Sequence, residues 1–325
     1  MNSSEILIES ECDPNFDPLF ENLIYLVTAA YLSIGLFLHC SILKTILITD
    51  RSFFKDNSFF MLFAMDSLAM FFQSTFLIIN DLFFGRVFMY IPQLCPIISP
   101  FFWTPSIFLK LSYVLNNHAR FAKSVAQIFM VLNRMSCVMI PATYNTIWSK
   151  ITPIACSLVF ILPFTGLWNI IISRVFILSV RGGFGVSYIK AVPWASLSKF
   201  QSIFILTALL FTVICTTVTL YKLISLPGRI KSVEKSLCIT SLSISSTFLL
   251  VAITQLLFAF CGGCQSDALY ILQFLAFDTF TVGSAVIMML TNKQLRSSLL
   301  SLTRTRGKVQ NTITVTAMPS GRFST

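Results

Sequence analysis

The stretch from Gln127 to Trp148 reads QIFMVLNRMSCVMIPATYNTIW and decides how the rest of the chain is interpreted. An apolar helix carries Asn133 and Arg134 near its end, and Pro141 and a short polar link follow. An arginine in a lipid-spanning helix costs roughly 2.5–3.5 kcal/mol. Such a residue is retained when it faces the interior of a helix bundle and has a function there. We therefore interpret Arg134 as a functional residue rather than as an ordinary positive-inside anchor.

The composition indicates a membrane protein. The chain has 325 residues, of which 55% are hydrophobic and 11% charged, and it contains 33 phenylalanines. A soluble globular chain has about 25% charged residues. We therefore predict one membrane domain with short tails. The net charge of +10 does not indicate nucleic-acid binding, because the charges are concentrated at the two ends of the chain.

The placement of these charges predicts the orientation. Residues 1–21 contain six acids and no lysine or arginine, whereas residues 292–325 contain six basic residues and no acid. Basic residues near membrane spans stay on the cytoplasmic side. The N-terminus is therefore predicted outside and the C-terminus inside, which requires an odd number of spans. No cleavable signal peptide is visible, so the first span is expected to direct insertion.

Seven apolar stretches fit this requirement. They cover residues 22–48, 58–79, a third stretch starting between residues 110 and 121 and ending near 139, then 151–172, 199–224, 236–260 and 268–290. Trp148 is expected to anchor the fourth span at the inner interface. The prediction is an all-α membrane protein, a seven-transmembrane helix bundle with its N-terminus outside and its C-terminus cytoplasmic. An extracellular tail (1–21), a transmembrane domain (22–291) and a cytoplasmic tail (292–325) complete the division.

Two patches give the chain a resemblance to a known family. The first is LNRMSCVMIP at residues 132–141 with Tyr144 and Trp148, and the second is FDTFTVGS at 277–284 with MLTNKQLR at 289–296. With the seven-span pattern, they resemble the nematode serpentine receptor class gamma (Srg) family of chemosensory G-protein-coupled receptors. The chain departs from the rhodopsin-like pattern at Asn133, where an acid usually stands, and at Ala285, where a proline is expected.

The resemblance implies a function and a location. A small-molecule or pheromone-like ligand would bind from outside, and a heterotrimeric G protein would be activated inside. The protein would reside in the plasma membrane bilayer, in the cilia of sensory neurons, and a receptor dimer is left open. It implies no enzymatic activity, no cofactor and no nucleic-acid partner. The chain carries two histidines and no nucleophile or phosphate-loop motif.

Two groups of residues are candidates for transmitting the signal. A switch and G-protein-coupling group is predicted at the inner side and comprises Asn133, Arg134, Tyr144, Arg229, Lys231, Lys235, Lys293 and Arg296. Asp66 and Asp278 are the acids inside the predicted spans. They form either an intramembrane polar cluster that couples ligand to switch or simple helix-packing contacts, because buried carboxylates need a polar interior.

Further candidates lie toward the outer side. Trp103, Tyr113 and His118 could line a ligand pocket. His118, Lys110, Arg120 and Lys123 either attract an acidic ligand or, as we favour, reach solvent at an outer helix end by snorkelling. Disulfides are expected among Cys12, Cys95, Cys261 and Cys264, with the pairing undecided. Asn2 begins a glycosylation sequon.

The main alternative is a transporter or ligand-gated channel with a similar number of spans. Broken helices at matching positions in two halves would mark a transporter. The sequence PFTG at residues 163–166 is the nearest such break, and the other half has no counterpart.

Overall fold

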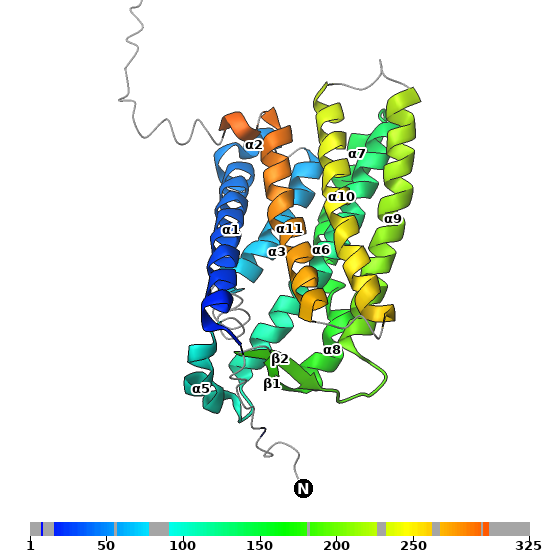
Figure 1. Cartoon of the computed structure of the whole chain (residues 1–325). Coiled ribbons are helices and arrows are strands. Elements are labelled where there is room, and N and C mark those ends of the chain that lie inside the picture. The colour runs from blue at the N-terminus through cyan, green and yellow to red at the C-terminus, as the bar shows by residue number, and fades with distance from the viewer. Residues whose placement is uncertain are drawn as a thin grey trace, which may run out of the picture.

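The computed structural model describes residues 8, 16–54, 57–77, 91–180, 183–225, 232–261, 267–293 and 295–298. Long helices lie side by side in a bundle, and a small hairpin lies at one end (Figure 1). The long helices are α1 (Pro18–Lys44), α3 (Ser58–Leu77), α6 (Ile107–Met139), α7 (Tyr144–Ile161), α8 (Phe164–Ile172), α9 (Leu197–Ser225), α10 (Ser232–Phe260) and α11 (Asp267–Thr291).

Short elements join or flank them. A π-helical turn (Thr45–Thr49) and α2 (Arg51–Phe54) follow α1. A 3₁₀ turn (Pro92–Leu94), α5 (Cys95–Ile98) and a second 3₁₀ turn (Ser99–Phe102) precede α6.

Five helical segments of the described chain are long and apolar enough to cross a membrane. They are Pro18–Thr49, Tyr144–Ile172, Leu197–Ser225, Ser236–Leu257 and Ile271–Thr291. Large apolar side chains such as Ile203, Leu210 and Ile214 on α9 are exposed, as expected for a surface in contact with lipid. The chain is therefore a largely helical, multi-pass membrane protein, which confirms that part of the prediction.

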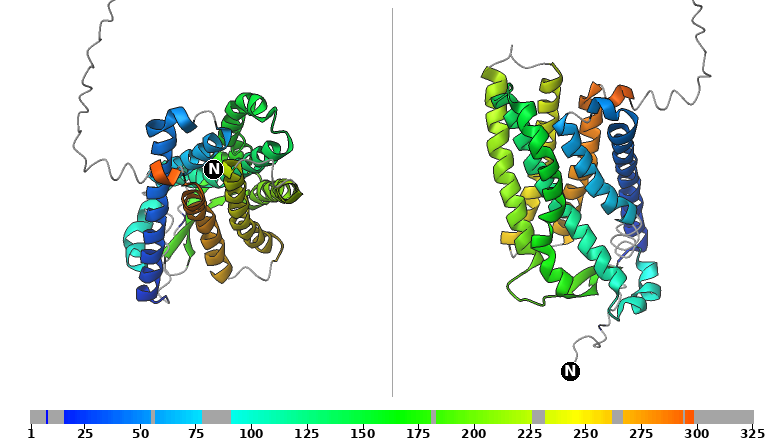
Figure 2. Two further views of the ribbon diagram at one scale, coloured as in Figure 1. Left: turned by 90° about the horizontal axis from the view of Figure 1, so that it is seen from above. Right: turned by 180° about the vertical axis from the view of Figure 1, so that it is seen from behind.

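The helix α6 is central despite its charges. It packs against α3, α7, α8, α9 and α10 (Figure 2). Lys110, Arg120, Lys123 and Arg134 lower its mean hydropathy, so it is not among the five apolar segments. Because its neighbours surround it, most of these polar groups face protein rather than lipid.

Two helices begin earlier than the sequence suggested. Asp17 caps α1 by accepting a hydrogen bond from the Leu19 amide at 3.0 Å, so α1 begins at Pro18. Glu21, which we assigned to the extracellular tail, therefore lies inside α1 and is buried. Ser106 caps α6 through the Leu109 amide at 3.3 Å, and α6 begins at Ile107, before the predicted window.

The fourth apolar stretch is broken. The helix α7 starts at Tyr144, ends at Ile161, and gives way to α8 after Pro163. Proline lacks the amide hydrogen that a continuous helix needs. The prediction that Trp148 is an interfacial anchor is wrong, because its side chain is buried within the bundle.

The predicted all-helical architecture needs one addition, a β-hairpin in the segment 173–198. Strands β1 (Arg174–Val180) and β2 (Gly183–Ile189) pair antiparallel, with Val180 opposite Gly183. Val175, Ile177 and Phe184 are buried in a cluster that includes Leu109 of α6 and Leu197 of α9. The hairpin therefore closes onto the ends of α6 and α9 (Figure 1).

The contact between α1 and α11 depends on a small residue. A Cβ atom at Gly35 would lie 2.5 Å from Cγ2 of Val282 on α11. The two helices can approach this closely only because Gly35 has no side chain, as is common where helices pack in membranes.

Candidate functional site

A cluster of polar side chains lies where three helices begin or end on the same side of the bundle. Asn133 and Arg134 belong to the last turns of α6, Tyr144 is the first residue of α7, and Ser58 is the first residue of α3. We call Ser58, Asn133, Arg134 and Tyr144 the arginine clamp. Helix ends leave room for such groups, because side chains can converge there without interrupting a helix.

Hydrogen bonds connect all four members of the arginine clamp. Arg134 donates through Nε to Oδ1 of Asn133 at 3.1 Å and through Nη2 to the same oxygen and to the Tyr144 hydroxyl at 2.8 Å. The Tyr144 hydroxyl donates to Oδ1 of Asn133 at 3.0 Å. Nδ2 of Asn133 donates to Ser58 Oγ at 2.7 Å, which lies 2.8 Å from the Tyr144 hydroxyl. The arginine is thus held by neutral acceptors.

The guanidinium of Arg134 is buried without an anionic partner. Its side chain is 2% exposed, and no carboxylate in the described part of the chain pairs with it. The positive charge instead faces aromatic rings, with Cζ 4.4 Å from the centroid of Phe59 and 6.0 Å from that of Tyr144. Such contacts contribute about 2 kcal/mol or more when desolvated.

A second pair of residues supports the clamp. The indole of Trp148 donates to Ser136 Oγ at 2.6 Å, and Ser136 donates to the Asn133 carbonyl at 3.0 Å. This connection fixes the first turn of α7 against the last turn of α6. Trp148 therefore acts as a packing residue behind the clamp.

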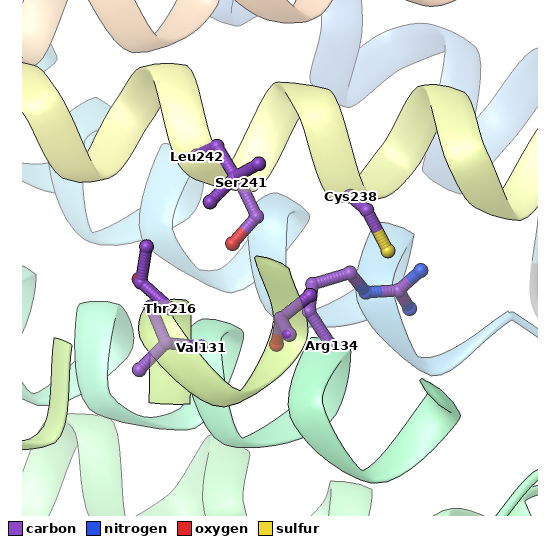
Figure 3. Close-up of a pocket in the computed structure, with 7 residues that line it drawn as sticks. Val131, Arg134, Thr216, Cys238, Ser241 and Leu242 are labelled. Carbon is purple, nitrogen blue, oxygen red and sulfur yellow. The ribbon is translucent and has the colours of Figure 1, made fainter. Parts of the chain in front are cut away.

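A pocket of about 170 Å³ lies beside the clamp, between α6, α9 and α10. Val131 and Arg134 of α6 line one side, while Cys238, Ser241 and Leu242 of α10 line another. In Figure 3 the side chain of Arg134 extends toward that of Cys238. A group entering between α6 and α10 would therefore meet the guanidinium.

A second polar site lies near the middle of α6. Nζ of Lys123 lies 3.2 Å from Oδ2 of Asp66 on α3, and their side chains are 4% and 1% exposed. Nζ also lies 4.6 Å from the centroid of Phe280 on α11. Our prediction that Lys123 snorkels to an outer helix end is therefore wrong, since a carboxylate inside the bundle compensates its charge.

The acids Asp66 and Asp278 have different partners. Asp66 pairs with Lys123, whereas Asp278 on α11 accepts a hydrogen bond from the Tyr31 hydroxyl of α1. Between these pairs, His39 contacts Ser67 Oγ at 2.9 Å and the Thr281 carbonyl at 3.1 Å. Polar contacts therefore tie α1, α3, α6 and α11 together at this level. The contribution of Lys123 and His39 was missed at the sequence level.

A third contact links α6 to its other neighbours. Nε2 of Gln127 donates to Ser245 Oγ on α10 at 3.1 Å and to Thr212 Oγ1 on α9 at 3.5 Å. It lies one turn from Lys123 toward the clamp. The buried polar side of α6 thus continues from Lys123 through Gln127 to Arg134.

The residues proposed for a ligand pocket are not gathered in one place. Trp103 and Tyr113 pack against the apolar cluster under the hairpin, where the ring centroids of Tyr113 and Tyr188 lie 6.2 Å apart. His118 instead faces α7, since its Nε2 donates to the Phe160 carbonyl at 2.9 Å.

The remaining predicted residues fall into two groups. Lys293 and Arg296 are exposed beyond α11. Arg229, Lys231, Cys12, Cys264 and Asn2 lie outside the described residues, as does the side chain of Lys235 in α10. Cys95 and Cys261 are disulfide-bonded, while Cys40, Cys137, Cys156, Cys215 and Cys238 are free thiols.

Multiple apolar helices around a buried arginine cluster define the class as a serpentine membrane protein. The family model described as Srg family chemoreceptor matches residues 25–299. Serpentine receptor class gamma-17 of Caenorhabditis elegans is 64% identical over 327 residues, covering 100% of this chain and 99% of the relative. Serpentine receptor class gamma-15 of the same organism is 53% identical, covering 89% of this chain and 90% of the relative.

The chain therefore belongs to the Srg family of serpentine chemoreceptors, which confirms the resemblance found in the sequence. Serpentine receptor class gamma-16 of Caenorhabditis elegans is also similar, with 52% identity covering 92% of this chain and 90% of the relative. The family is one of receptors rather than enzymes.

Proposed function

We propose that this chemoreceptor spans the plasma membrane seven times, binds a small molecule from outside and activates a heterotrimeric G protein inside. In this proposal α3 and α6 are spans in addition to the five apolar segments, and the end with the arginine clamp faces the cytoplasm. The sensory cilium is the proposed location, and a receptor dimer stays open as an assembly.

The arginine clamp with its adjoining pocket is the observation that carries this proposal. Arg134 is buried and saturated by neutral partners, yet it lines a space between α6, α9 and α10. In the resting state the clamp holds α3, α6 and α7 together. A ligand that favours separation of α10 from α6 would shift the bundle toward an open inner face.

The open face offers a partner a cation and several hydrogen-bonding groups. Arg134 would exchange its contacts with Asn133 and Tyr144 for acceptors on the G protein. Hydrogen bonds to a charged group contribute about 1.5–3 kcal/mol each, so this exchange can be nearly balanced. The equilibrium between resting and active states then remains sensitive to a small ligand.

The orientation is tested first by epitope tags at the two termini. We expect an N-terminal tag to stain on intact cells and a C-terminal tag to stain only after permeabilisation. A cytoplasmic N-terminus would put the clamp on the outer side of the membrane and would refute the proposed coupling.

The coupling is tested by nucleotide exchange on a panel of heterotrimeric G proteins in receptor-containing membranes. We expect at least one G protein to respond above receptor-free membranes, and we expect Arg134→Ala to abolish this response at equal surface expression. Lys150→Ala serves as the control, because Lys150 is an exposed cation on α7 outside the clamp. An unchanged response in Arg134→Ala would disprove the role of the clamp.

A further inference from the structure

The same end of the bundle carries a basic rim on α1, α2 and the segment after α11. We define the basic rim as Lys44, Arg51, Lys293 and Arg296, all of which are exposed. Within residues 41–54 and 287–298 the sequence contains one acid, Asp50. The rim therefore has an excess of positive charge that no local acid balances.

The segment after α11 is fixed rather than free at this position. Leu295 is fully buried and belongs to the same apolar cluster as Ile42 and Phe54. Its amide donates to Asn292 Oδ1 at 2.9 Å, which caps the turn that follows α11. Figures 1 and 2 show this short orange helix beside α2 and the end of α1. Lys293 and Arg296 thus lie beside the cations of α1 and α2.

Exposed apolar side chains lie directly below the rim. Ile48 is 73% exposed one helical turn after Lys44, and Leu290 is 67% exposed three residues before Lys293. The helices α1 and α11 pack against each other, so these side chains flank a shared surface. Cations above an apolar surface match the two parts of a phospholipid, a charged headgroup and acyl chains.

We propose that the basic rim binds the headgroup of an anionic phospholipid whose acyl chains lie against Ile48 and Leu290. This proposal rests on the membrane insertion proposed above, but it needs neither a chemosensory ligand nor a G protein. A bound lipid would hold the segment after α11 against α1 and α2. It would thereby keep the cytoplasmic tail to one side of the pocket beside Arg134.

Native mass spectrometry of the detergent-solubilised receptor tests the proposal directly. The probe is phosphatidylinositol bisphosphate, titrated against phosphatidylcholine. A basic residue near an anionic lipid surface contributes roughly fivefold in affinity, so two such residues contribute on the order of thirtyfold. We expect the variant Arg51→Gln/Arg296→Gln to bind the probe at least tenfold more weakly than the natural receptor.

The matched control removes the same charge elsewhere on this end of the bundle. Lys150→Gln/Lys222→Gln neutralises two cations on α7 and α9 and is expected to change the affinity less than twofold. Equal losses in both variants would show diffuse attraction to total charge and would overturn the site. The thermal unfolding midpoint of each variant verifies that the bundle is intact.

The source of the phosphate is separated by competition. Soluble inositol trisphosphate carries the headgroup phosphates without acyl chains, and we expect it to displace the lipid poorly. Displacement at equal concentration would overturn the assignment of Ile48 and Leu290 to the acyl chains. Because binding is measured without any signalling, failure of the proposed G-protein coupling would leave these outcomes interpretable.

Discussion

Lys123 on α6 and Asp66 on α3 form an ion pair of 3.2 Å in the interior of the bundle, separated by 57 positions in the sequence. Each charge alone would be costly in this environment, so each stabilises the other. The Phe280 ring covers the ammonium on the side of α11.

Removing one member of this pair is expected to destabilise the receptor more than removing both. Lys123→Met leaves the Asp66 carboxylate buried and unpaired, at a cost of about 3–5 kcal/mol. Asp66→Leu leaves the ammonium unpaired. The double variant contains no buried charge at this site and should recover much of the loss. Thermal unfolding midpoints of the natural receptor, both single variants and the double variant complete the cycle; strictly additive losses would contradict the pairing.

Tyr144→Phe is expected to raise basal signalling. The change removes the hydroxyl that accepts from Arg134 and donates to Asn133, and the hydrogen bond to the charged group contributes about 1.5–3 kcal/mol. The resting state is therefore weakened by about tenfold or more. Basal nucleotide exchange measures the effect, and Tyr221→Phe is the control, because Tyr221 is 66% exposed on α9. A Tyr144→Phe receptor with natural basal activity would show that the clamp does not restrain activation.

Ser245→Ala tests the connection between α6 and α10. The change removes the acceptor of the 3.1 Å hydrogen bond from Gln127, which ties the two helices together. One hydrogen bond contributes about 0.5–1.5 kcal/mol, so basal exchange should rise by a few fold. Ser246→Ala is the adjacent control, since Ser246 is exposed and bonds the Ser243 carbonyl of its own helix. Equal effects in the two variants would argue against the tether.

Gly35→Ala is expected to destabilise the bundle. The added methyl group would lie 2.5 Å from Val282, so α1 and α11 must move apart. Overpacking of this kind costs typically about 1–3 kcal/mol. Gly283→Ala provides the control, because a Cβ at Gly283 meets Thr247 at an ordinary 3.7 Å. Thermal unfolding in detergent should show a lower midpoint for Gly35→Ala alone; equal midpoints would mean that the interface adapts without cost.

The arginine clamp was partly predictable because part of it is local. Asn133, Arg134 and Tyr144 lie within eleven positions of one another and share one turn between helices. Ser58 completes the clamp from a position 75 residues before Asn133. No periodicity in the sequence connects residues at that separation, so tertiary packing alone identifies Ser58.

The hairpin was missed although a signal for it exists. Gly182 and Gly183 separate two runs rich in valine, isoleucine and aromatic residues, a pattern typical of hairpins. In a chain that is 55% hydrophobic, those runs do not stand out from the surrounding helices. The Lys123 error has a similar origin, since helical position predicts a buried face but does not reveal the acid on the neighbouring helix.

Lys123 lies sixteen residues from either end of α6 (Ile107–Met139), which makes its ion pair with Asp66 the midpoint of the longest helix in the described chain. Sixteen residues of helix span about 24 Å. If the ion pair acts as a fulcrum, a tilt of roughly 5° displaces each end of α6 by about 2 Å, in opposite directions. A small displacement under the hairpin would then arrive at Arg134 with equal size and inverted sign, as in a balanced lever.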